Sequence, residues 1–444
     1  MQLPDKLKES KLLVHKGDEL RKNNEFEAAI ECYTKAMYDD PKNSFNFFKR
    51  GQTYMQINKM SEAIADFNTA ISLSPDFSFA YYKRGLASLE MKQYRIAIDD
   101  FTHAVTLNSE LNYIYSKRAY CYLVMKEYDK AIMDFTNAIE VDKKNPVLYF
   151  YRANAFFTLK NYEKAKEDYS IAIELNPNDE KSLLSRAVCL TNLSDTEMAV
   201  LDFDRVITLN PTSKLAYQYR AILAIQLKRY ENAIDDIDRL VKLKIEDKKS
   251  YVSRAFCNFQ LKNYAASVSD YTKAIALDSE DAGLYLNRAN SQYNIGNYEE
   301  AILDYKKVLE LKPDEHQSML LQHIASCYSH IEDYKEAIKH YSKIIAIDPK
   351  YVQGYLSRGI AFMKLKYTNK ALEDFTLALE IKPDMSQAFL NKALVYKSMN
   401  KFEEAAANFI NYLYLVPEDG KYIKQIKAWL NKNNFPYEIE TTAE

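Results

Sequence analysis

The chain repeats itself every 34 residues. A segment that begins at Tyr128, and carries small and aromatic residues at fixed spacings, recurs from Tyr162, from Tyr264 and from Tyr298. A period between about 20 and 50 residues marks an array of one supersecondary element instead of several globular domains. Only His316 and Gln317 fall between repeats. The twelve predicted repeats cover residues 10–419 and are 10–43, 44–77, 78–111, 112–145, 146–179, 180–213, 214–247, 248–281, 282–315, 318–351, 352–385 and 386–419.

Small residues and prolines divide each repeat into two helices. Position 8, counted from the first residue of a repeat, is always Gly or Ala beside larger apolar residues at helical spacing, which lets two helices approach closely. Position 32 is a proline in eight repeats, and a proline ends one helix before the next begins. We therefore expect a first helix over about positions 1–14 and a second over about positions 15–30.

The residue pattern within each repeat resembles that of the tetratricopeptide repeat. The shared features are the period, the small residue at position 8, aromatic residues at positions 17 and 24, Ala at positions 20 and 27, and Pro at position 32. The departures are local: Thr196 and Thr368 at position 17, and Ile237 and Leu240 at positions 24 and 27 of one repeat. The resemblance implies an all-α solenoid of helix hairpins stacked into a right-handed superhelix. It also implies a concave groove, lined by the first helices, that usually holds a partner peptide or helix.

The two ends of the array are expected to present polar surface, because a terminal repeat has only one neighbour. Residues 1–9 form a lead-in, and apolar residues three or four apart predict a closing helix over 420–432. Residues 433–444 show no periodicity and are expected to be frayed or disordered. The first helix of repeat 1 carries charges that suit an outer surface: Lys16, Asp18, Glu19, Arg21 and Lys22.

Composition argues against several classes of partner. Sixty Lys and Arg against 62 Asp and Glu leave a net charge of -2, so no positive field draws the protein to nucleic acid. No apolar run approaches the about 18 residues of a membrane-spanning helix, and charges interrupt the first residues of the chain. We expect a cytoplasmic protein without membrane insertion.

The sequence lacks the motifs of common enzyme sites. Only eight glycines occur, so phosphate-binding loops and many left-handed backbone corners are not expected. Gly354 and Gly359 form the nearest glycine pair, and no Lys follows them as a nucleotide loop requires. Without a nucleophile motif or a paired set of carboxylates, we expect a protein that is not an enzyme and needs no cofactor.

Positions 7 and 23 change together when the twelve repeats are compared. Repeats 1, 10 and 12 lack both an Arg at position 7 and an Asp at position 23. Since these positions lie opposite each other in an antiparallel hairpin, we predict a bridge in each of the other nine. A ligand-binding ladder of arginines is less favoured, because a partnered Arg is less available to a ligand. The predicted pairs are Arg50–Asp66, Arg84–Asp100, Arg118–Asp134, Arg152–Asp168, Arg186–Asp202, Arg220–Asp236, Arg254–Asp270, Arg288–Asp304 and Arg358–Asp374.

One arrangement of histidine and cysteine has the chemistry of a metal site. His323, Cys327 and His330 share a helix face at i, i+4 and i+7, and zinc uses such side chains. Against this, the spacing matches no established zinc motif, and position 10 is a small packing site. We therefore expect neither a metal nor a disulfide. The other cysteines at position 10 are Cys121, Cys189 and Cys257.

The first helices supply the residues predicted to line the groove. Position 6 is Lys in three successive repeats, as Lys49, Lys83 and Lys117, which favours an acidic partner segment. Aromatic, apolar and amide residues follow, and such side chains anchor peptides and amphipathic helices. Alternatively, the lysines are a solvated face and the aromatic residues belong to the core. The candidate binding residues after the lysines are Tyr120, Tyr151, Asn154, Phe157, Ile222, Phe256 and Tyr293.

These patterns favour a non-enzymatic scaffold or adaptor that binds a partner peptide or helix. The alternative is a substrate-recognition or regulatory subunit of an enzyme or chaperone complex. A subset of the family binds chaperone C-termini through a carboxylate clamp of Lys, Asn and Arg at set positions, and no window of this chain matches that clamp.

Overall fold

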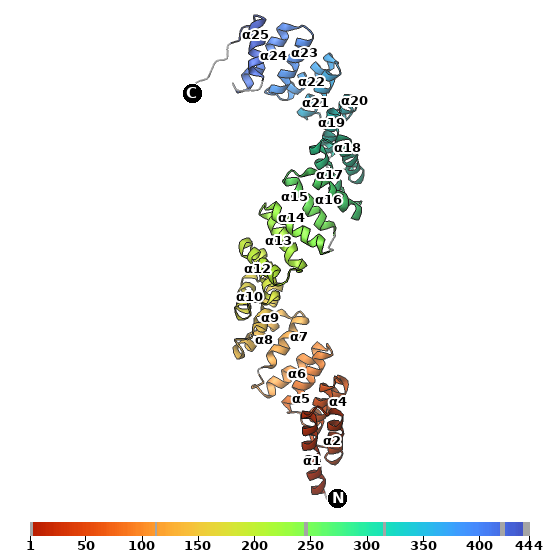
Figure 1. Ribbon diagram of the computed structural model, residues 1–444, viewed down its shortest axis with the longest axis vertical. Helices are drawn as coiled ribbons and strands as arrows, with labels where there is room; N and C mark the ends of the chain where they lie inside the picture. The colour runs from red at the N-terminus through yellow and green to blue at the C-terminus, as the bar shows by residue number, and fades with distance from the viewer. Residues whose placement is uncertain (1–2, 112, 244–246, 314–316, 418–421, 438–444) are drawn as a thin grey trace, which may run out of the picture. The chain divides into compact units, whose positions relative to one another are not determined.

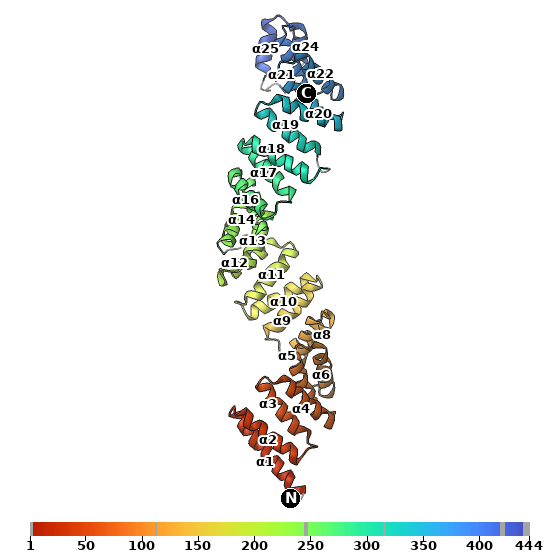
Figure 2. The same cartoon turned by 90° about the vertical axis from the view of Figure 1, so that its right-hand side faces the viewer.

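The computed structural model describes residues 3–111, 113–243, 247–313, 317–417 and 422–437, which form 25 helices and no strand. The chain divides into two compact parts, residues 1–223 and 224–444. Within each part, helices that follow one another in sequence lie side by side, as the colour order in Figure 1 and Figure 2 shows. None of the described helices combines the length and the apolar character needed to span a bilayer.

Each repeat contributes two helices, which confirms the all-α fold of helix hairpins. The right-handed superhelix concerns the whole chain and stays a prediction. One further helix, α25 (Ile423–Lys432), follows the repeats. The first helices are α1 (Leu3–Lys22), α3 (Ser44–Gln56), α5 (Ser78–Glu90), α7 (Ile114–Val124), α9 (Pro146–Thr158), α11 (Glu180–Asn192), α13 (Lys214–Gln226), α15 (Lys248–Gln260), α17 (Ala282–Ile295), α19 (Gln317–His330), α21 (Val352–Lys364) and α23 (Ser386–Ser398). The second helices are α2 (Phe26–Asp39), α4 (Met60–Leu73), α6 (Tyr94–Leu107), α8 (Tyr128–Val141), α10 (Tyr162–Leu175), α12 (Thr196–Leu209), α14 (Tyr230–Lys242), α16 (Tyr264–Leu277), α18 (Tyr298–Leu311), α20 (Tyr334–Ile347), α22 (Thr368–Ile381) and α24 (Phe402–Leu415).

The turn inside each hairpin places position 15 in the left-handed backbone conformation. Only Gly296 is a glycine there, with φ +86°, and Lys, Asn, Ser or Glu occupies the other turns at φ between 57 and 65°. In repeat 1 the amide of Glu25 donates to the carbonyl of Leu20 at 2.9 Å, and the amide of Asn24 donates to the carbonyl of Arg21 at 3.2 Å. These two bonds form a Schellman cap, which offsets the left-handed cost of about 1–2 kcal/mol. The expectation that scarce glycine excludes such corners is therefore wrong.

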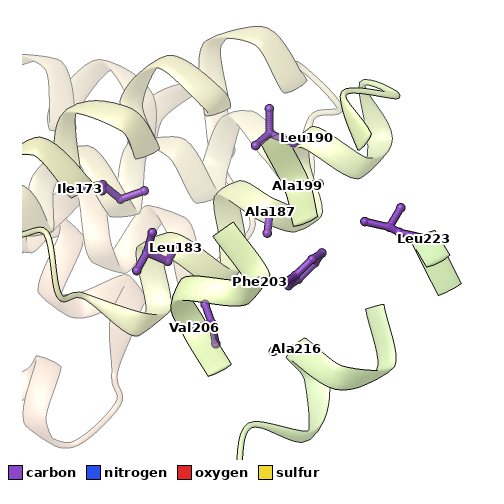
Figure 3. Packing of buried hydrophobic residues seen from close by; sticks show 9 residues of the cluster. All are labelled: Ile173, Leu183, Ala187, Leu190, Ala199, Phe203, Val206, Ala216 and Leu223. Carbon is purple, nitrogen blue, oxygen red and sulfur yellow. The ribbon is translucent and has the colours of Figure 1, made fainter. Parts of the chain in front are cut away.

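A strip of buried side chains runs along each part, because neighbouring hairpins within a part pack on each other. In Figure 3, the side chain of Phe203 on α12 points toward α13, and it belongs to the same cluster as the small residues Ala187 and Ala199. Some first helices of neighbouring repeats also contact each other directly, as α3 does α5, α7 does α9 and α21 does α23. The cluster in Figure 3 joins four helices and consists of Ile173, Leu183, Ala187, Leu190, Ala199, Phe203, Val206, Ala216 and Leu223.

The small residue at position 8 sets the distance between the two helices of a hairpin. A Cβ added to Gly51 would lie 2.8 Å from the ring of Phe67, and one added to Gly85 would lie 2.8 Å from the ring of Phe101. Both rings are fully buried. The aromatic residue at position 24 therefore packs directly on the backbone of the facing helix.

The N-terminal end differs from the expectation in two ways. The lead-in is helical from Leu3 and continues into repeat 1 as α1. Lys16 and Glu19 are exposed as expected, but Asp18 and Arg21 contact side chains of repeat 2 and do not belong to an outer surface.

The C-terminal end also differs from the expectation. Trp429 of α25 packs edge-on against Phe409 at 5.3 Å, and Phe435 stacks on Trp429 at 6.0 Å between ring centroids. Tyr437 joins the same cluster. The expected fraying is therefore wrong for residues 433–437, because aromatic side chains hold this segment on α25. Residues 418–421 and 438–444 lie outside the described residues.

Repeat 10 is built differently at the positions of the Arg–Asp pair. Ile324 and His340 stand at these positions and are both buried. Nδ1 of His340 lies 3.0 Å from the carbonyl oxygen of Glu336, and the ring packs on Tyr328 at 5.4 Å. Gln317 begins α19, whereas His316 lies outside the described residues.

Candidate functional site

The Arg and Asp side chains at positions 7 and 23 meet inside the hairpins. In eight of the nine predicted pairs the nearest nitrogen and oxygen atoms are 2.6–2.8 Å apart. Nε and Nη2 of the Arg both donate, so each pair is bidentate, as Arg118 shows with Asp134. The ninth pair, Arg220 and Asp236, joins residues of the two separate parts and stays a prediction.

Each of these arginines also contacts the preceding repeat, which the sequence analysis missed. Nη1 of Arg152 donates to the hydroxyl of Thr136, at position 25 of repeat 4, at 3.0 Å. A sequence signal for this contact exists, because position 25 carries an oxygen acceptor before every repeat that has the Arg. Before repeat 10, which lacks the Arg, position 25 is Lys306. The other acceptors at position 25 are Thr34, Asn68, Thr102, Ser170, Asp204, Asp238, Thr272 and Ser342.

Among the described residues, an aromatic ring also lies over the guanidinium of eight of these nine arginines, and Arg186 is the exception. Arg152 lies 5.8 Å from the centroid of Tyr149, and Arg254 lies 5.9 Å from that of Tyr251. With Asp and an acceptor of the preceding repeat as partners, Nε, Nη1 and Nη2 each donate a hydrogen bond within the protein, as in Arg152. The arrangement favours a structural role over a ligand-binding ladder.

Lys49, the first of the three candidate lysines, is neutralised within the protein. Its Nζ lies 3.0 Å from both carboxylate oxygens of Asp18, which also accepts from the hydroxyl of Tyr33 at 2.7 Å. Burial raises the pKa of Asp18, but the hydrogen bonds from Tyr33 and Lys49 and the positive charges of Lys49 and Arg21 outweigh it and hold that pKa below its usual value. Asp18 thus stays ionised and forms an ion pair with the ammonium group of Lys49.

Lys83 and Lys117 have a different environment. Among the described residues, neither has a carboxylate within ion-pair distance. Lys83 is half-buried, with Nζ 5.3 Å from the centroid of the Tyr82 ring, whereas Lys117 is exposed. Burial, and then repulsion by the guanidinium of Arg21, lowers the pKa of Lys83. The half-buried ammonium of Lys83 therefore lacks a compensating charge.

Exposed aromatic residues stand at position 2 of these repeats, four residues before position 6; Tyr113 is the residue that directly precedes α7. Phe45, Phe79 and Tyr113 are 43–45% exposed. Residues at i and i+4 share a helix face, so rings and ammonium groups lie on one surface. We call Phe45, Phe79, Lys83, Tyr113 and Lys117 the aromatic–lysine face. An aromatic residue at position 2 of three successive repeats is the sequence signal that could have identified these rings.

The middle candidates divide into partly exposed and packed residues. Tyr120 is 36% exposed and contacts Tyr151 edge-on at 5.7 Å. Asn154 accepts from the hydroxyl of Tyr169 at 2.7 Å, and Phe157 packs on Tyr162 at 5.3 Å, so both serve their own hairpin. Ile222 is half-buried.

Two candidates lie in the C-terminal part. Phe256 is 39% exposed and meets Tyr230 edge-on at 6.1 Å. The hydroxyl of Tyr293 lies 3.1 Å from Oγ of Ser326 and 3.1 Å from Nε2 of His330. Tyr293 also lines a hollow formed by α15, α17, α18 and α19.

The histidines and the cysteine considered for a metal each have another environment. His323 stacks on Tyr305 at 5.2 Å, and His330 stacks on Tyr298 at 4.5 Å. Cys327 is fully buried, and burial raises the pKa of its thiol to about 12. Within the described part of the chain, no group of three or more His, Cys, Asp or Glu side chains is arranged to hold a metal ion.

Comparison with protein families identifies the array. One tetratricopeptide-repeat model matches seven segments, which together cover more than half of the chain: 10–43, 80–111, 113–145, 249–281, 320–351, 352–385 and 386–419. The chain belongs to the tetratricopeptide repeat (TPR) family. A second TPR model matches residues 51–92, and a third matches residues 146–179 and 282–315. Residues 180–247 lie outside these segments, although their described residues form helices α11–α14 of the TPR array. As a TPR protein, the chain is a protein-interaction scaffold.

Several solved structures are similar to this TPR chain. A crystal structure of MamA protein is 27% identical over 39% of this chain and 94% of its own, with a TM-score of 0.36. A crystal structure of yeast Tom70 is 17% identical over 96% of both chains, with a TM-score of 0.34. A structure of Naa15/Naa10 bound to HypK-THB is 14% identical over 96% of this chain and 70% of the other, with a TM-score of 0.43. No curated protein matches the sequence.

Proposed function

We propose that the chain is a non-enzymatic scaffold or adaptor that holds an acidic segment of a partner protein on the aromatic–lysine face. The observation that carries this proposal is Lys83, a half-buried ammonium group near Arg21 without an acidic partner among the described residues. Placing a charge in a partly desolvated position is unfavourable unless an opposite charge compensates it. A partner carboxylate provides that compensation.

Asp18 supports the same chemistry from within the chain. Its carboxylate contacts Lys49 directly and lies 3.8 Å from the guanidinium of Arg21. The protein thus already places one carboxylate among the cations of these first helices. Because Asp18 occupies Lys49, the partner carboxylates are expected at Lys83 and Lys117.

The exposed rings define the rest of the partner segment. Phe79 precedes Lys83 by one turn, and Tyr113 precedes Lys117 by one turn. Aromatic side chains bury a large apolar area when a partner covers them. The face therefore suits a segment in which acidic and apolar side chains alternate, and the near-balanced net charge disfavours nucleic acid.

A charge-reversal experiment tests this function. The probe is a short labelled peptide that alternates Glu and Leu, and its affinity for the full chain is measured by fluorescence anisotropy. Lys83→Glu or Lys117→Glu should weaken binding at least about 10-fold, and added salt should weaken binding to the wild type.

The matched control is Lys35→Glu, which makes the same charge change at an exposed position of the second helix α2. It should bind the peptide like the wild type. Circular dichroism checks that each variant is folded. If Lys83→Glu does not fold, because Lys83 is half-buried, the exposed position in Lys117→Glu still tests the proposal. Equal affinity of a folded Lys117→Glu variant and the wild type would contradict the proposal.

A further inference from the structure

The least exposed of the described histidines lie in repeat 10, near its contact with repeat 9. His323 of α19 is half-buried and stacks on Tyr305 of α18, with 5.2 Å between the ring centroids. His340 of α20 is buried and packs on Tyr328 of α19 at 5.4 Å. The other described histidines are exposed and are His15, His103 and His330.

Tyr328 links His340 to repeat 9. Its hydroxyl accepts a hydrogen bond from Nζ of Lys306 on α18 at 2.9 Å, and the same Nζ lies 5.4 Å from the centroid of the Tyr328 ring. Lys306 of repeat 9 and His340 of repeat 10 are thus neighbours of one ring. Elsewhere in the array, position 25 usually carries an oxygen acceptor and position 23 an Asp, whereas here both positions carry groups that can be positive.

His340 is surrounded by more positive than negative charge. Burial is the largest cause that lowers the pKa of His340, and the charges of Lys343 on the same helix and Lys306 on α18 lower it further. The carbonyl of Glu336, 3.0 Å from Nδ1, and the Glu336 carboxylate act in the opposite direction without outweighing burial. That carboxylate is itself paired with Lys339. His340 is therefore neutral at pH 7, and protonation would add a cation among lysines.

The other helices packed against α20 do not compensate such a cation. From α19, position 7 contributes the uncharged Ile324 and Tyr328 lies against the His340 ring. From α21 comes Arg358, whose charge is paired with Asp374. Among the described residues, no carboxylate lies within ion-pair distance of His340.

His323 also lacks an opposite charge. It faces a hollow whose lining includes two titratable neighbours, Tyr305 of α18 and Tyr293 of α17, but no Lys, Arg, Asp or Glu. Burial lowers the pKa of His323, so its ring is uncharged at pH 7. An imidazolium at this position would lose hydration without gaining an ion pair.

We propose that the contact between repeats 9 and 10 is an acid-sensitive joint, which opens when His323 and His340 are protonated while the hairpins on both sides stay folded. Opening restores water to both imidazolium groups and separates His340 from Lys306 across the Tyr328 ring. It also changes the course of the array between repeats 9 and 10, and with it the arrangement in which the flanking repeats hold partner proteins. The joint shares no residue with the aromatic–lysine face and does not depend on it.

The direction of the pH effect follows from the lowered pKa values of both histidines. In the open joint each histidine titrates near its usual value of about 6.5, and in the closed joint it titrates at lower pH. The closed joint is therefore fully stable above about pH 6.5 and loses stability as the pH falls through the lowered pKa. At pH 5, each histidine that is still neutral in the closed joint raises the open population by at most about 30-fold.

Cys327 provides a probe inside this contact. Its thiol is fully buried in the cluster that joins Tyr305 and Val308 of α18 to Ile324 of α19. A reagent reaches the thiol only when the two repeats separate. The full chain is therefore treated briefly with a pyridyl disulfide at pH 7.5 and at pH 5, and the labelling rate of each cysteine is measured by mass spectrometry of peptides.

Cys257 is the internal control, because it has the same position in repeat 8 and is equally buried, against Ala224 and Ala233 of repeat 7. Repeats 7 and 8 contain no histidine. Burial raises the pKa of the Cys327 thiol to about 12 and that of Cys257 to about 11, so both thiolate fractions change in parallel between pH 7.5 and pH 5. The ratio of the Cys327 rate to the Cys257 rate should rise about 10-fold at pH 5.

Substitutions assign the rise to the two histidines. His323→Gln and His340→Gln should each reduce it, and the double variant should abolish it. His103→Gln, at an exposed position of α6, is the matched control and should rise like the wild type. Lys306→Thr gives repeat 9 the residue that repeat 8 has at Thr272, and removal of the cation beside Tyr328 should also reduce the rise. This exposed substitution tests the joint even if the double variant does not fold.

Circular dichroism separates opening of the joint from unfolding of a repeat. At pH 5 the helix content of the wild type should equal that at pH 7.5. The proposal is overturned if the rate ratio is the same at both pH values, or if a folded double variant or Lys306→Thr shows the full wild-type rise. Loss of helix content together with the rise would also overturn it, because repeat 10 would then unfold instead of separating from repeat 9.

Discussion

Arg118 and Asp134 form a bidentate ion pair between the two helices of one hairpin, with Nε to Oδ2 at 2.7 Å and Nη2 to Oδ1 at 2.8 Å. The Asp134 side chain is 0% exposed and that of Arg118 is 12% exposed. A surface pair contributes little to stability, but removing one partner of a buried pair leaves an uncompensated charge. The same relationship recurs along the array, so single substitutions can test it locally.

Asp134→Ala should destabilise repeat 4 by about 3 kcal/mol, because Arg118 loses both charge-assisted hydrogen bonds in a buried setting. Urea unfolding followed by circular dichroism measures the effect. Asp129→Asn, at an exposed position of the same helix, is the control and should shift the midpoint only slightly. Similar midpoints for Asp134→Ala and the control would show that the pair is dispensable.

Thr136→Val should weaken the contact between repeats 4 and 5 by about 1 kcal/mol, because Nη1 of Arg152 loses its acceptor. Amide hydrogen exchange in α8 and α9 should report this loss locally. Thr106→Val is the matched control, since Thr106 and Thr136 both donate to a carbonyl one turn earlier at 2.8 Å. If amide protons exchange at the same rates in the two variants, the hydrogen bond from Arg152 to Thr136 adds no stability.

Gly85→Ala should destabilise the hairpin of repeat 3 although Ala favours helices. The new Cβ would lie 2.8 Å from Cε1 and 2.9 Å from Cδ1 of the buried Phe101 ring. Overpacking of this kind costs about 1–3 kcal/mol, which exceeds the helix-propensity gain of about 1 kcal/mol. Phe101→Leu in the same chain should recover part of the lost thermal stability, and an unchanged melting temperature for Gly85→Ala alone would contradict the packing argument.

Phe435→Ala should release the C-terminal segment from α25. Trp429 is the only tryptophan of the chain, so its emission reports this cluster. Loss of the stacked ring exposes the indole, and the emission maximum should shift to longer wavelength without a large change in helix content. Tyr414→Ala, which alters an exposed ring on α24, should leave the emission maximum in place. An unshifted spectrum for Phe435→Ala would mean that this segment does not cover Trp429 in solution.

Repeat 10 should lose stability in mild acid. Burial is the main cause that lowers the pKa of His340 below the usual value of a histidine, about 6.5, so the unfolded chain binds a proton more readily than the folded chain does. The contribution of neutral His340 is present above about pH 6.5 and is lost as the pH falls through its folded pKa. His340→Gln should reduce the fall in urea midpoint between neutral and mildly acidic pH. If the urea midpoint falls equally in the variant and the wild type, protonation of His340 is not a cause of the loss of stability in acid.

The sequence determined the parts of the structure that follow from its period. The period places positions 7 and 23 opposite each other in every hairpin, so co-variation of Arg and Asp points to side chains that lie within ion-pair distance. Small residues at position 8 and prolines at position 32 likewise define where helices meet and end. These features depend on the spacing of residues along the chain, which can be read directly from the sequence.

The sequence did not reveal which polar and aromatic side chains already have partners within the folded protein, and the tertiary structure was needed to identify them. Lys49, Lys83 and Lys117 are equivalent by position, yet Asp18 of the preceding repeat neutralises Lys49 alone. Phe435 lies in a segment without periodicity, yet it stacks on Trp429. The physical reason is that pairing and desolvation depend on neighbours brought together by packing, which the spacing within one repeat does not specify.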